Sequence, residues 1–441
     1  MTGKGKTVVR GGWGMFYDAF AQDIFLGHFP WNCFFCPGPA YVGYGPGAIS
    51  SLSLLGGALD PNLPVYDPAS ASPNQEFFGT DPKLRTPYVQ NFNLNLQQAA
   101  GGKAVVEVGY VGSKGTKLFR FRDINQPTQA EITAADLANG VSSFGVPRHY
   151  PNAWPFYVNL EESKSSSIYH ALQTSLRLNQ WHGLNSQANF VWSHAIDDAS
   201  DSEDFIPNQA QPTNSWNPAG ERGNSSFDIR RRFTWNFAYQ FPKWSGPLSK
   251  LKSGWGFDGV LSLQDGQPFH LNYLFEGDYS GAGQGFDRPD VIGPIRYGSL
   301  PLNFLDLSSF AAPCTWDPNQ NQGATDESNC VAGTRHFGNL GRNSLRGPSF
   351  KELNFALSKN TAITERVSLQ LRAEFFNLFN HPNFSSPILP LFAADIGSPD
   401  AATGRHGGFY QLTATGDVGV GNPFLGGGGP RGIQLAAKFT F

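Results

Sequence analysis

Hydrophobic and polar residues alternate along much of this chain with a period of two, which is typical of β-strands because successive side chains point to opposite faces. The clearest segment is 232–241, where five aromatic residues share one face and polar or small residues occupy the other. Segment 7–17 is rich in aromatic, β-branched and glycine residues, which predicts a curved strand. Ten strands are expected in all, at 7–17, 88–98, 103–112, 168–181, 184–196, 232–241, 255–272, 350–359, 366–379 and 432–441. Residues 117–122 are expected to continue the third strand after a Gly-Ser-Lys-Gly interruption, as a bulge would allow.

The connections between these expected strands alternate between long and short. Because consecutive connections of an antiparallel meander emerge at opposite ends, all the long ones are expected on one rim. Transmembrane barrels show this asymmetry, with short periplasmic turns and long extracellular loops, whereas a soluble sandwich has no reason for it. The long connections begin at Asp18, Asp123, Asp197, Glu276 and His381, and the short ones lie at Gly101, His182, Pro242 and Asn360.

Composition supports an all-β membrane protein. Among 441 residues, 15% are charged and 14% are aromatic, and no apolar run approaches the roughly 18 residues of a transmembrane helix. Only helices and closed barrels satisfy their backbone hydrogen bonds in a bilayer, so a chain that spans the membrane here does so as a barrel. The net charge of -3 gives no electrostatic basis for binding nucleic acid.

The amino terminus has no apolar segment after its basic residues and no small-residue cleavage site, so no signal peptide is predicted. Since an outer-membrane protein needs an export signal, we expect a fragment of a longer protein. Residues 1–441 are then the carboxyl-terminal part of a single barrel domain without its plug. Ten strands drawn from a larger cylinder are expected to form a curved, incomplete sheet with two unpaired edges.

Four cysteines occur as two pairs, Cys33 with Cys36 and Cys314 with Cys330, each in a region rich in Gly, Pro, Asn and Asp. The spacing favours two local disulfides in an oxidising compartment. A zinc site is the alternative, but a single CxxC without a second such motif or paired histidines supports it weakly.

An acidic cluster opens the third long loop, and its residues are Asp197, Asp198, Asp201, Glu203 and Asp204. The spacing differs from that of an EF-hand, which favours a solvated loop and leaves a calcium site as the alternative.

No catalytic constellation is apparent. Ser249 and Lys252 match SxxK without the partner motifs, and HExxH, GxSxG and the phosphate-binding loop are absent from the sequence. We predict neither an enzyme nor a cofactor. The candidate lumen-facing residues are Arg177, Arg232, Arg372 and Glu374, and the alternative is that they belong to a hydrogen-bonded wall without substrate contact.

Six segments carry a family resemblance: KTVVRGGWGMFYD, SIYHALQTSLRLNQ, FVWSHAIDDASD, FDIRRRFTWNFAYQFP, LRAEFFNLFNHPNF and RGIQLAAKFTF. Together they resemble the carboxyl-terminal barrel of Oar-like TonB-dependent transporters of the bacterial outer membrane. The resemblance implies a barrel of about 22 strands, plugged by an amino-terminal domain that carries an energy-coupling box. The plug, the coupling box and about half of those strands are not in this sequence.

Two functions are therefore expected. The first is TonB-dependent uptake of an unidentified solute as part of a larger receptor, and the alternative is a non-transporting surface or adhesion protein. The alternating terminal strand ends on Phe439 and Phe441, which resemble the signal read by the barrel-assembly machinery. The expected partners are outer-membrane lipid and lipopolysaccharide, that assembly machinery, and the TonB system through the missing amino-terminal part.

Overall fold

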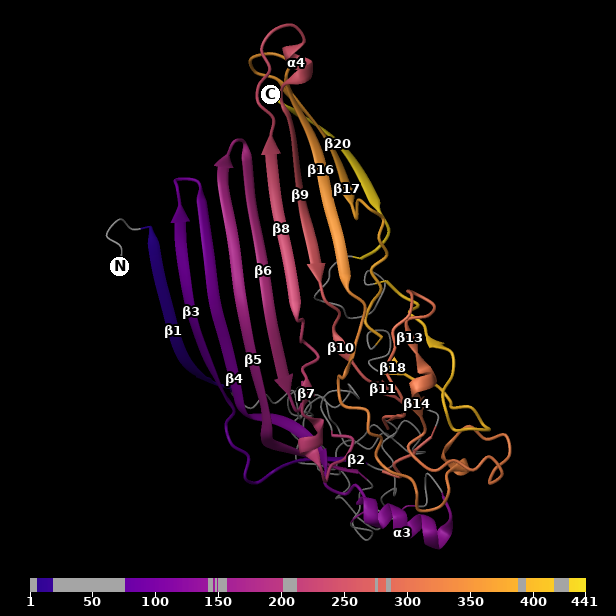
Figure 1. Ribbon diagram of the computed structural model, residues 1–441. Helices are drawn as coiled ribbons and strands as arrows, with labels where there is room; N and C mark the ends of the chain where they lie inside the picture. The colour runs from indigo at the N-terminus through magenta and orange to yellow at the C-terminus, as the bar shows by residue number, and fades with distance from the viewer. Residues whose placement is uncertain are drawn as a thin grey trace, which may run out of the picture.

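A computed structural model describes residues 6–18, 76–141, 146, 149, 157–200, 212–273, 277–282, 287–387, 394–415 and 428–441. Its main feature is a large curved sheet whose long strands are antiparallel neighbours in chain order (Figure 1). These strands are β1 Thr7–Tyr17, β3 Tyr88–Ala100, β4 Ala104–Asp123, β5 Tyr157–Trp181, β6 Leu184–Asp197, β8 Arg231–Gln240, β9 Trp255–Gln264, β16 Phe350–Ala362, β17 Ser368–Phe376 and β20 Gly432–Thr440.

The prediction of a ten-stranded antiparallel meander is confirmed, and so is the prediction that it does not close. The pairing path starts at β1 and ends at β20, and these two strands do not pair with each other. Two further strands join the sheet at the side: β2 Glu76–Thr80 runs parallel to β5, and β7 Gly223–Asn224 pairs with β6. Within the described residues, β1 and β20 are the open edges of this path.

The strand register gives the sheet two chemically different faces. One row across β6, β8, β9 and β16 joins Ala188, Trp235, Leu261 and Leu353. The next row, on the opposite face, joins Gln187, Asn236, Val260 and Asn354. Because side chains alternate along every strand, we call these the apolar face and the polar face throughout.

The apolar face is largely uncovered. Leu94 of β3, Trp192 of β6 and Leu435 of β20 are 58%, 60% and 78% exposed, respectively. A continuous apolar surface spread over so many strands marks contact with a membrane or another apolar partner. This is the arrangement expected where lipid covers one face of a barrel wall.

Short and long connections lie at opposite ends of the sheet, as predicted (Figure 1). The turn between β5 and β6 uses His182 and Gly183, both at positive φ. A Cβ on Gly183 would lie 2.8 Å from the carbonyl oxygen of Gln240, so both the backbone conformation and the space favour glycine there. The connection between β8 and β9 contains one helical turn, α4 Ser249–Lys252, which includes both residues of the SxxK match.

The expected single strand at 255–272 is wrong in its second half. β9 ends at Gln264, and the chain leaves the sheet to form β10 Pro268–Phe269 and β11 Leu271–Asn272. At Gly266 the backbone approaches the Gly347 carbonyl so closely that a Cβ would lie 1.9 Å from that oxygen. Pro268 has no N–H to continue a sheet ladder. The two short strands pair instead with β15 Leu345–Arg346 and with β18 Ala394–Asp395.

The third strand of the prediction is one continuous strand, β4, through the Gly-Ser-Lys-Gly segment. The register shifts lie after it, between Thr116 and Leu118 and between Leu118 and Arg120. Lys117, between the first pair, has φ of 58°. A bulge is therefore present, but beyond the glycines.

The long connections were expected to be irregular, and this is wrong for several of them. Helix α3 Gln129–Asn139 begins with a capping box, in which the side chains of Thr128 and Glu131 bond to each other's backbone N–H groups. The remaining short elements are η1 Pro218–Glu221, β12 Asp290–Val291, β13 Leu305–Asp306, η2 Leu307–Ser309, β14 Phe310–Ala311, η3 Glu327–Asn329 and β19 Phe409–Tyr410.

A hydrophobic core lies among these connections rather than on the sheet. It is built from the connections after β9 and after β17, with Phe269, Leu305 and Phe310 fully buried. We call the described residues of the long connections after β4, β6, β9 and β17 the loop unit. None of the described helices is both long and apolar enough to cross a membrane.

Candidate functional site

The four residues predicted to face a lumen all lie on the polar face. Arg177 of β5 pairs with Gln187, and Arg232 of β8 pairs with Gln264. Arg372 and Glu374 of β17 pair with Ala436 and Gln434 of β20. Contact of these residues with a solute stays a prediction.

Arg372 is the centre of an ionic network on this face. Its Nη1 and Nη2 atoms lie 2.8 Å from the two carboxylate oxygens of Asp258, and its Nε lies 2.8 Å from Glu374. Since β16 separates β9 from β17, the arginine reaches across an intervening strand. The bidentate geometry fixes the guanidinium over the polar face.

Arg177 lies apart from this network but shares a cavity with Asp258. This shallow, open cavity has a volume of about 540 Å³ and is lined mainly by polar-face residues of β5, β6, β8 and β9, among them Gln187 and Asn236. Sequence reasoning did not select Asp258, although it occupies a polar position in the alternation of β9. It is the acidic partner of Arg372.

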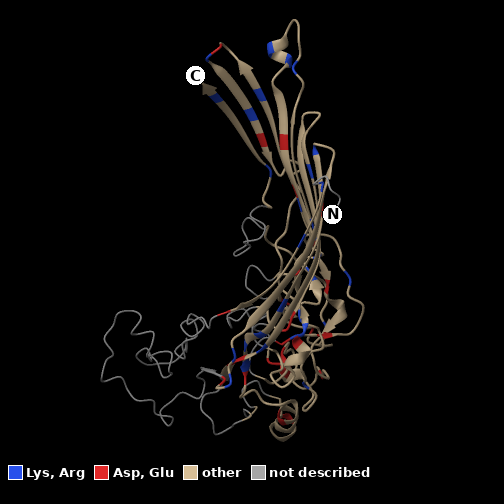
Figure 2. Ribbon diagram, turned by 90° about the vertical axis from the view of Figure 1, so that its left-hand side faces the viewer, with Lys and Arg blue, Asp and Glu red and all other residues tan. Residues whose placement is uncertain are grey.

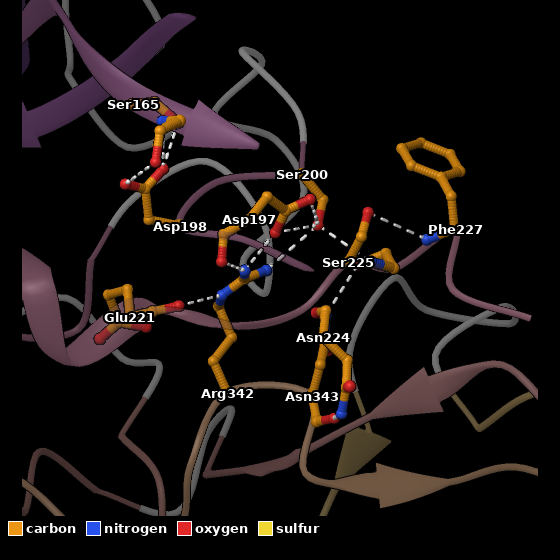
Figure 3. Close-up of polar contacts among 12 residues, drawn as sticks. Ser165, Asp197, Asp198, Ser200, Glu221, Asn224, Ser225, Phe227, Arg342 and Asn343 are labelled. Atoms are coloured by element: carbon orange, nitrogen blue, oxygen red, sulfur yellow. Dashed lines mark hydrogen bonds and ion pairs between the residues drawn. The ribbon is translucent and has the colours of Figure 1, made fainter. Parts of the chain in front are cut away.

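Charged residues are crowded at the loop end of the sheet (Figure 2). There the buried Arg342 donates 2.7 Å hydrogen bonds to the backbone carbonyls of Glu221 and Asp197, and forms an ion pair with the Asp197 carboxylate. Figure 3 shows Arg342 reaching toward Asp197 and Ser200. The network ties the connection after β6 to the connection between β9 and β16, which contains Arg342.

The interpretation of the acidic cluster as a solvated loop is wrong for its first residue. Asp197 is 4% exposed and is paired with Arg342. Asp198 accepts hydrogen bonds from the Ser165 hydroxyl at 2.5 Å and from the Ser166 N–H at 2.7 Å. Asp201, Glu203 and Asp204 lie outside the described residues. Among those described, no group of three or more His, Cys, Asp or Glu side chains is placed to hold a metal ion.

A second buried carboxylate joins β6 to the connection after β6 and to the connection between β9 and β16. Asp228 is 1% exposed, accepts the Ala195 N–H at 2.7 Å, and pairs with Arg230 at 2.8 Å and with Arg346. The backbone donor and the two guanidinium groups thus orient the Asp228 carboxylate from three directions. It therefore fixes the loops where they leave the strands.

A third ionic contact anchors helix α3. Arg335 donates to both carboxylate oxygens of Asp136, at 3.0 and 2.5 Å, and both residues are 1% exposed. Nearby, Glu221 pairs with the buried Arg288 at 2.5 Å. Burial lowers the pKa of His270 well below its usual value, and the neighbouring Arg288 and Arg342 lower it further. His270 is consequently neutral within this cationic surrounding.

The structure joins Cys314 and Cys330 by a disulfide, at a sequence separation of 16. Cys330 is buried in the core of the loop unit, and Cys314 packs against it. Cys33 and Cys36 lie outside the described residues, so their pairing stays a prediction.

The terminal aromatics lie at an open edge of the sheet. Phe439 of β20 pairs with Leu369 and is 58% exposed on the apolar face, and Phe441 is 95% exposed just beyond the strand. Their role as an assembly signal stays a prediction.

Several solved outer-membrane proteins are similar to this chain. They include the outer membrane transporter YddB from Escherichia coli (TM-score 0.38, 11% identity, 84% of this chain and 34% of that one). They also include the ferripyoverdine receptor of Pseudomonas aeruginosa (TM-score 0.35, 9% identity, 81% of this chain and 27% of that one). A third is the ferric citrate transporter FecA (TM-score 0.32, 10% identity, 80% of this chain and 31% of that one). The chain thus spans about a third of the length of these structures or less.

No curated protein matches the chain. The sequence profile of a family described as "outer membrane beta barrel domain" matches residues 1–411, which cover all the long strands except β20. This agrees with the two-faced antiparallel sheet and with its segregated short and long connections. The chain belongs to this family of outer-membrane β-barrel domains, and its place is the outer membrane.

Proposed function

We propose that the chain is part of a larger outer-membrane receptor that takes up a solute with energy delivered by the TonB system. The observation that carries this proposal is the polar face, where Arg177 and Asp258 line a cavity of about 540 Å³. A barrel wall whose inner face offers hydrogen-bonding and charged groups at fixed positions suits the passage of a polar solute.

The open sheet supports a larger assembly. β1 and β20 end the pairing path without pairing to each other, and open sheet edges do not occur in the hydrocarbon region. In the proposed receptor, further strands pair with these edges, and a plug domain fills the lumen. The terminal Phe439 and Phe441 would then direct assembly, and lipopolysaccharide would surround the outer half of the barrel.

Energy-dependent uptake tests this function. The protein, expressed from its own gene in cells that otherwise lack it, would be supplied with labelled iron chelates, oligosaccharides and peptides. We expect accumulation of one class, abolished by a protonophore and by deletion of the TonB system. Arg177→Ala should reduce uptake, whereas Leu176→Ala, one residue away on the apolar face, should not.

A surface or adhesion role is the second candidate, and the loop unit favours it. That unit has its own hydrophobic core, buried ion pairs and a disulfide. Such a body resists unfolding outside the cell and offers a rigid binding surface. Correctly folded protein that binds cells or matrix but accumulates none of the solutes would support this role and contradict transport.

A further inference from the structure

The connection between β8 and β9 has a composition unlike the other short turns. Residues 241–254 contain Lys243, Lys250 and Lys252 and no acidic residue. Figure 2 shows blue, basic residues on the helical turn α4 at the top of the molecule. Large apolar side chains accompany them, since Trp244, Leu248 and Leu251 are each more than half exposed. This combination is typical of segments that lie where a membrane meets water.

A groove on the apolar face begins at this connection. Its volume is about 760 Å³, and Leu357 of β16, Leu371 of β17 and Leu435 of β20 contribute apolar side chains to its walls. At the turn end it is bordered by Trp255, Lys250 and Lys359. The groove therefore presents hydrocarbon along the strands and positive charge at one end.

Lys359 is an unusual residue for this face. It is 8% exposed and lies in register between Trp255 of β9 and Leu371 of β17, both apolar. Its ammonium donates to the backbone carbonyls of Lys250, at 2.7 Å, and Ser253, and lies 5.5 Å from the centroid of the Trp255 ring. Carbonyl oxygens and a ring face orient a cation without neutralising its charge.

A second lysine and tryptophan stand beside the first pair. The Lys252 ammonium lies 4.8 Å from the centroid of the Trp244 ring. The Trp255 indole N–H donates to the Leu251 carbonyl at 2.9 Å, which holds the connection against the strands. The cationic end of the groove is thus a built feature rather than a set of free side chains.

We propose that this groove binds an anionic glycerophospholipid of the inner leaflet, with its phosphate at Lys250, Lys252 and Lys359 and its acyl chains along the leucines. Charge complementarity favours an anionic headgroup, and the apolar walls favour a lipid over free phosphate. We assign the inner leaflet because the groove begins at a short turn, and the short turns of outer-membrane barrels face the periplasm. The proposal rests on the outer-membrane placement but not on transport.

Lipid retention tests the proposal. The native protein would be placed in nanodiscs of phosphatidylcholine with a minority of phosphatidylglycerol, and the retained lipids would be counted by native mass spectrometry. We expect one phosphatidylglycerol held in preference to phosphatidylcholine. Because each lysine near an anionic lipid contributes a factor of about five, Lys250→Gln with Lys252→Gln should reduce that retention roughly twenty-five-fold.

Lys103→Gln is the matched control, since Lys103 is exposed in the β3–β4 turn at the same rim but far from the groove in strand order. It should leave retention unchanged. Equal retention of both lipids, an unaffected double variant, or an equal loss in the control would overturn the proposal. So would retention of lipid A in place of phosphatidylglycerol.

Fluorescence quenching is a second measurement, and it uses the unmodified protein, so it stays informative if the lysine variants do not fold. Brominated phosphatidylglycerol should quench the fluorescence of the unmodified protein more strongly than brominated phosphatidylcholine does. Trp255→Phe should remove most of that difference, whereas Trp192→Phe, on an apolar-face position of β6, should not. Equal quenching by the two brominated lipids would contradict a selective site. Failure of solute uptake would leave these lipid results unaffected.

Discussion

In the sheet every long strand from β3 onward pairs with the long strand that precedes it, whereas the loop unit joins segments far apart in the chain. β3 and β4 meet through a turn of a few residues, but Arg335 and Asp136 are 199 residues apart. The sheet presents one face to lipid and one to polar surroundings. The loop unit instead buries its ions and its hydrophobic side chains together. Mutations should therefore act on the two regions through different mechanisms.

Breaking a buried ion pair should have the largest effect. Asp197→Ala leaves the guanidinium of Arg342 buried without its carboxylate, which should destabilise the loop unit by about 3–5 kcal/mol. Faster hydrogen exchange of the amides near residue 342, with strand amides unchanged, is the expected result. Asp265→Ala removes the partner of the exposed Arg231 and serves as the control. Unchanged exchange in Asp197→Ala would mean that this pair does not hold the loops.

Loss of the disulfide should rank next. Replacing Cys314 and Cys330 by serine releases a loop of 16 residues, for which chain entropy predicts about 3 kcal/mol. Limited proteolysis of intact cells should then cut within the loop unit while the strands stay protected. If protease sensitivity is the same with and without the bridge, the core alone stabilises this unit.

A matched pair of substitutions compares the two faces of one strand. Leu261 and Val260 are neighbours on β9, on the apolar and polar faces. An arginine on the lipid face near the bilayer centre should cost about 2–4 kcal/mol, and one on the lumen face much less. Leu261→Arg should reduce the folded fraction in lipid vesicles, as judged by heat-modifiable gel mobility. Equal effects of Leu261→Arg and Val260→Arg would contradict the assignment of the faces.

Loss of the Arg372 network should have a smaller effect. The side chains of Arg372, Asp258 and Glu374 are 31%, 39% and 26% exposed, respectively, so solvent weakens each ion pair. Arg372→Ala should lower the free energy of unfolding by about 1 kcal/mol. Urea titration in detergent would measure it, with Gln370→Ala as the control on the same face. A decrease of several kcal/mol in the free energy of unfolding would show that solvent does not screen this network.

The smallest effect should depend on pH. The hydrogen bond to Asp290, 2.8 Å away, raises the pKa of His336 above 6.5, although burial opposes this. The stabilisation is fully present below pH 6.5 and is lost as the pH rises through the raised pKa. His336→Gln should remove this pH dependence, which amounts to less than about 1 kcal/mol of the free energy of unfolding. An unchanged pH profile of thermal unfolding in the variant would exclude the pair as its source.

Most of the sheet could be predicted because alternation is a local signal. Alternation also predicted which face carries each candidate lumen residue, because neighbouring positions on a strand point to opposite faces. These residues are Arg177, Arg232, Arg372 and Glu374. The end of β9 could have been found from Gly266 and Pro268. Helix α3 also carried a signal, because Thr128 and Glu131 have the spacing of a capping box.

The loop unit could not be predicted in the same way. Arg342 and Asp197 have no local pattern that pairs them, and the core residues Phe269 and Leu305 belong to short segments without a period. Such contacts form between segments that are far apart in the chain, so no short stretch of the sequence carries a pattern that predicts them. The groove at Lys359 was missed for a related reason, because its walls come from separate strands.

The length of β5 has a consequence for where the loop unit stands. At about 3.3 Å per residue, its 25 residues extend over roughly 80 Å, whereas a tilted strand needs only about ten residues to cross a bilayer. More than half of β5 therefore extends beyond the hydrocarbon core. The projecting end of β5 is packed, since Asn159, Glu161 and Glu162 are 1%, 2% and 0% exposed, so the loop unit rests on an extension of the same sheet whose other part crosses the lipid.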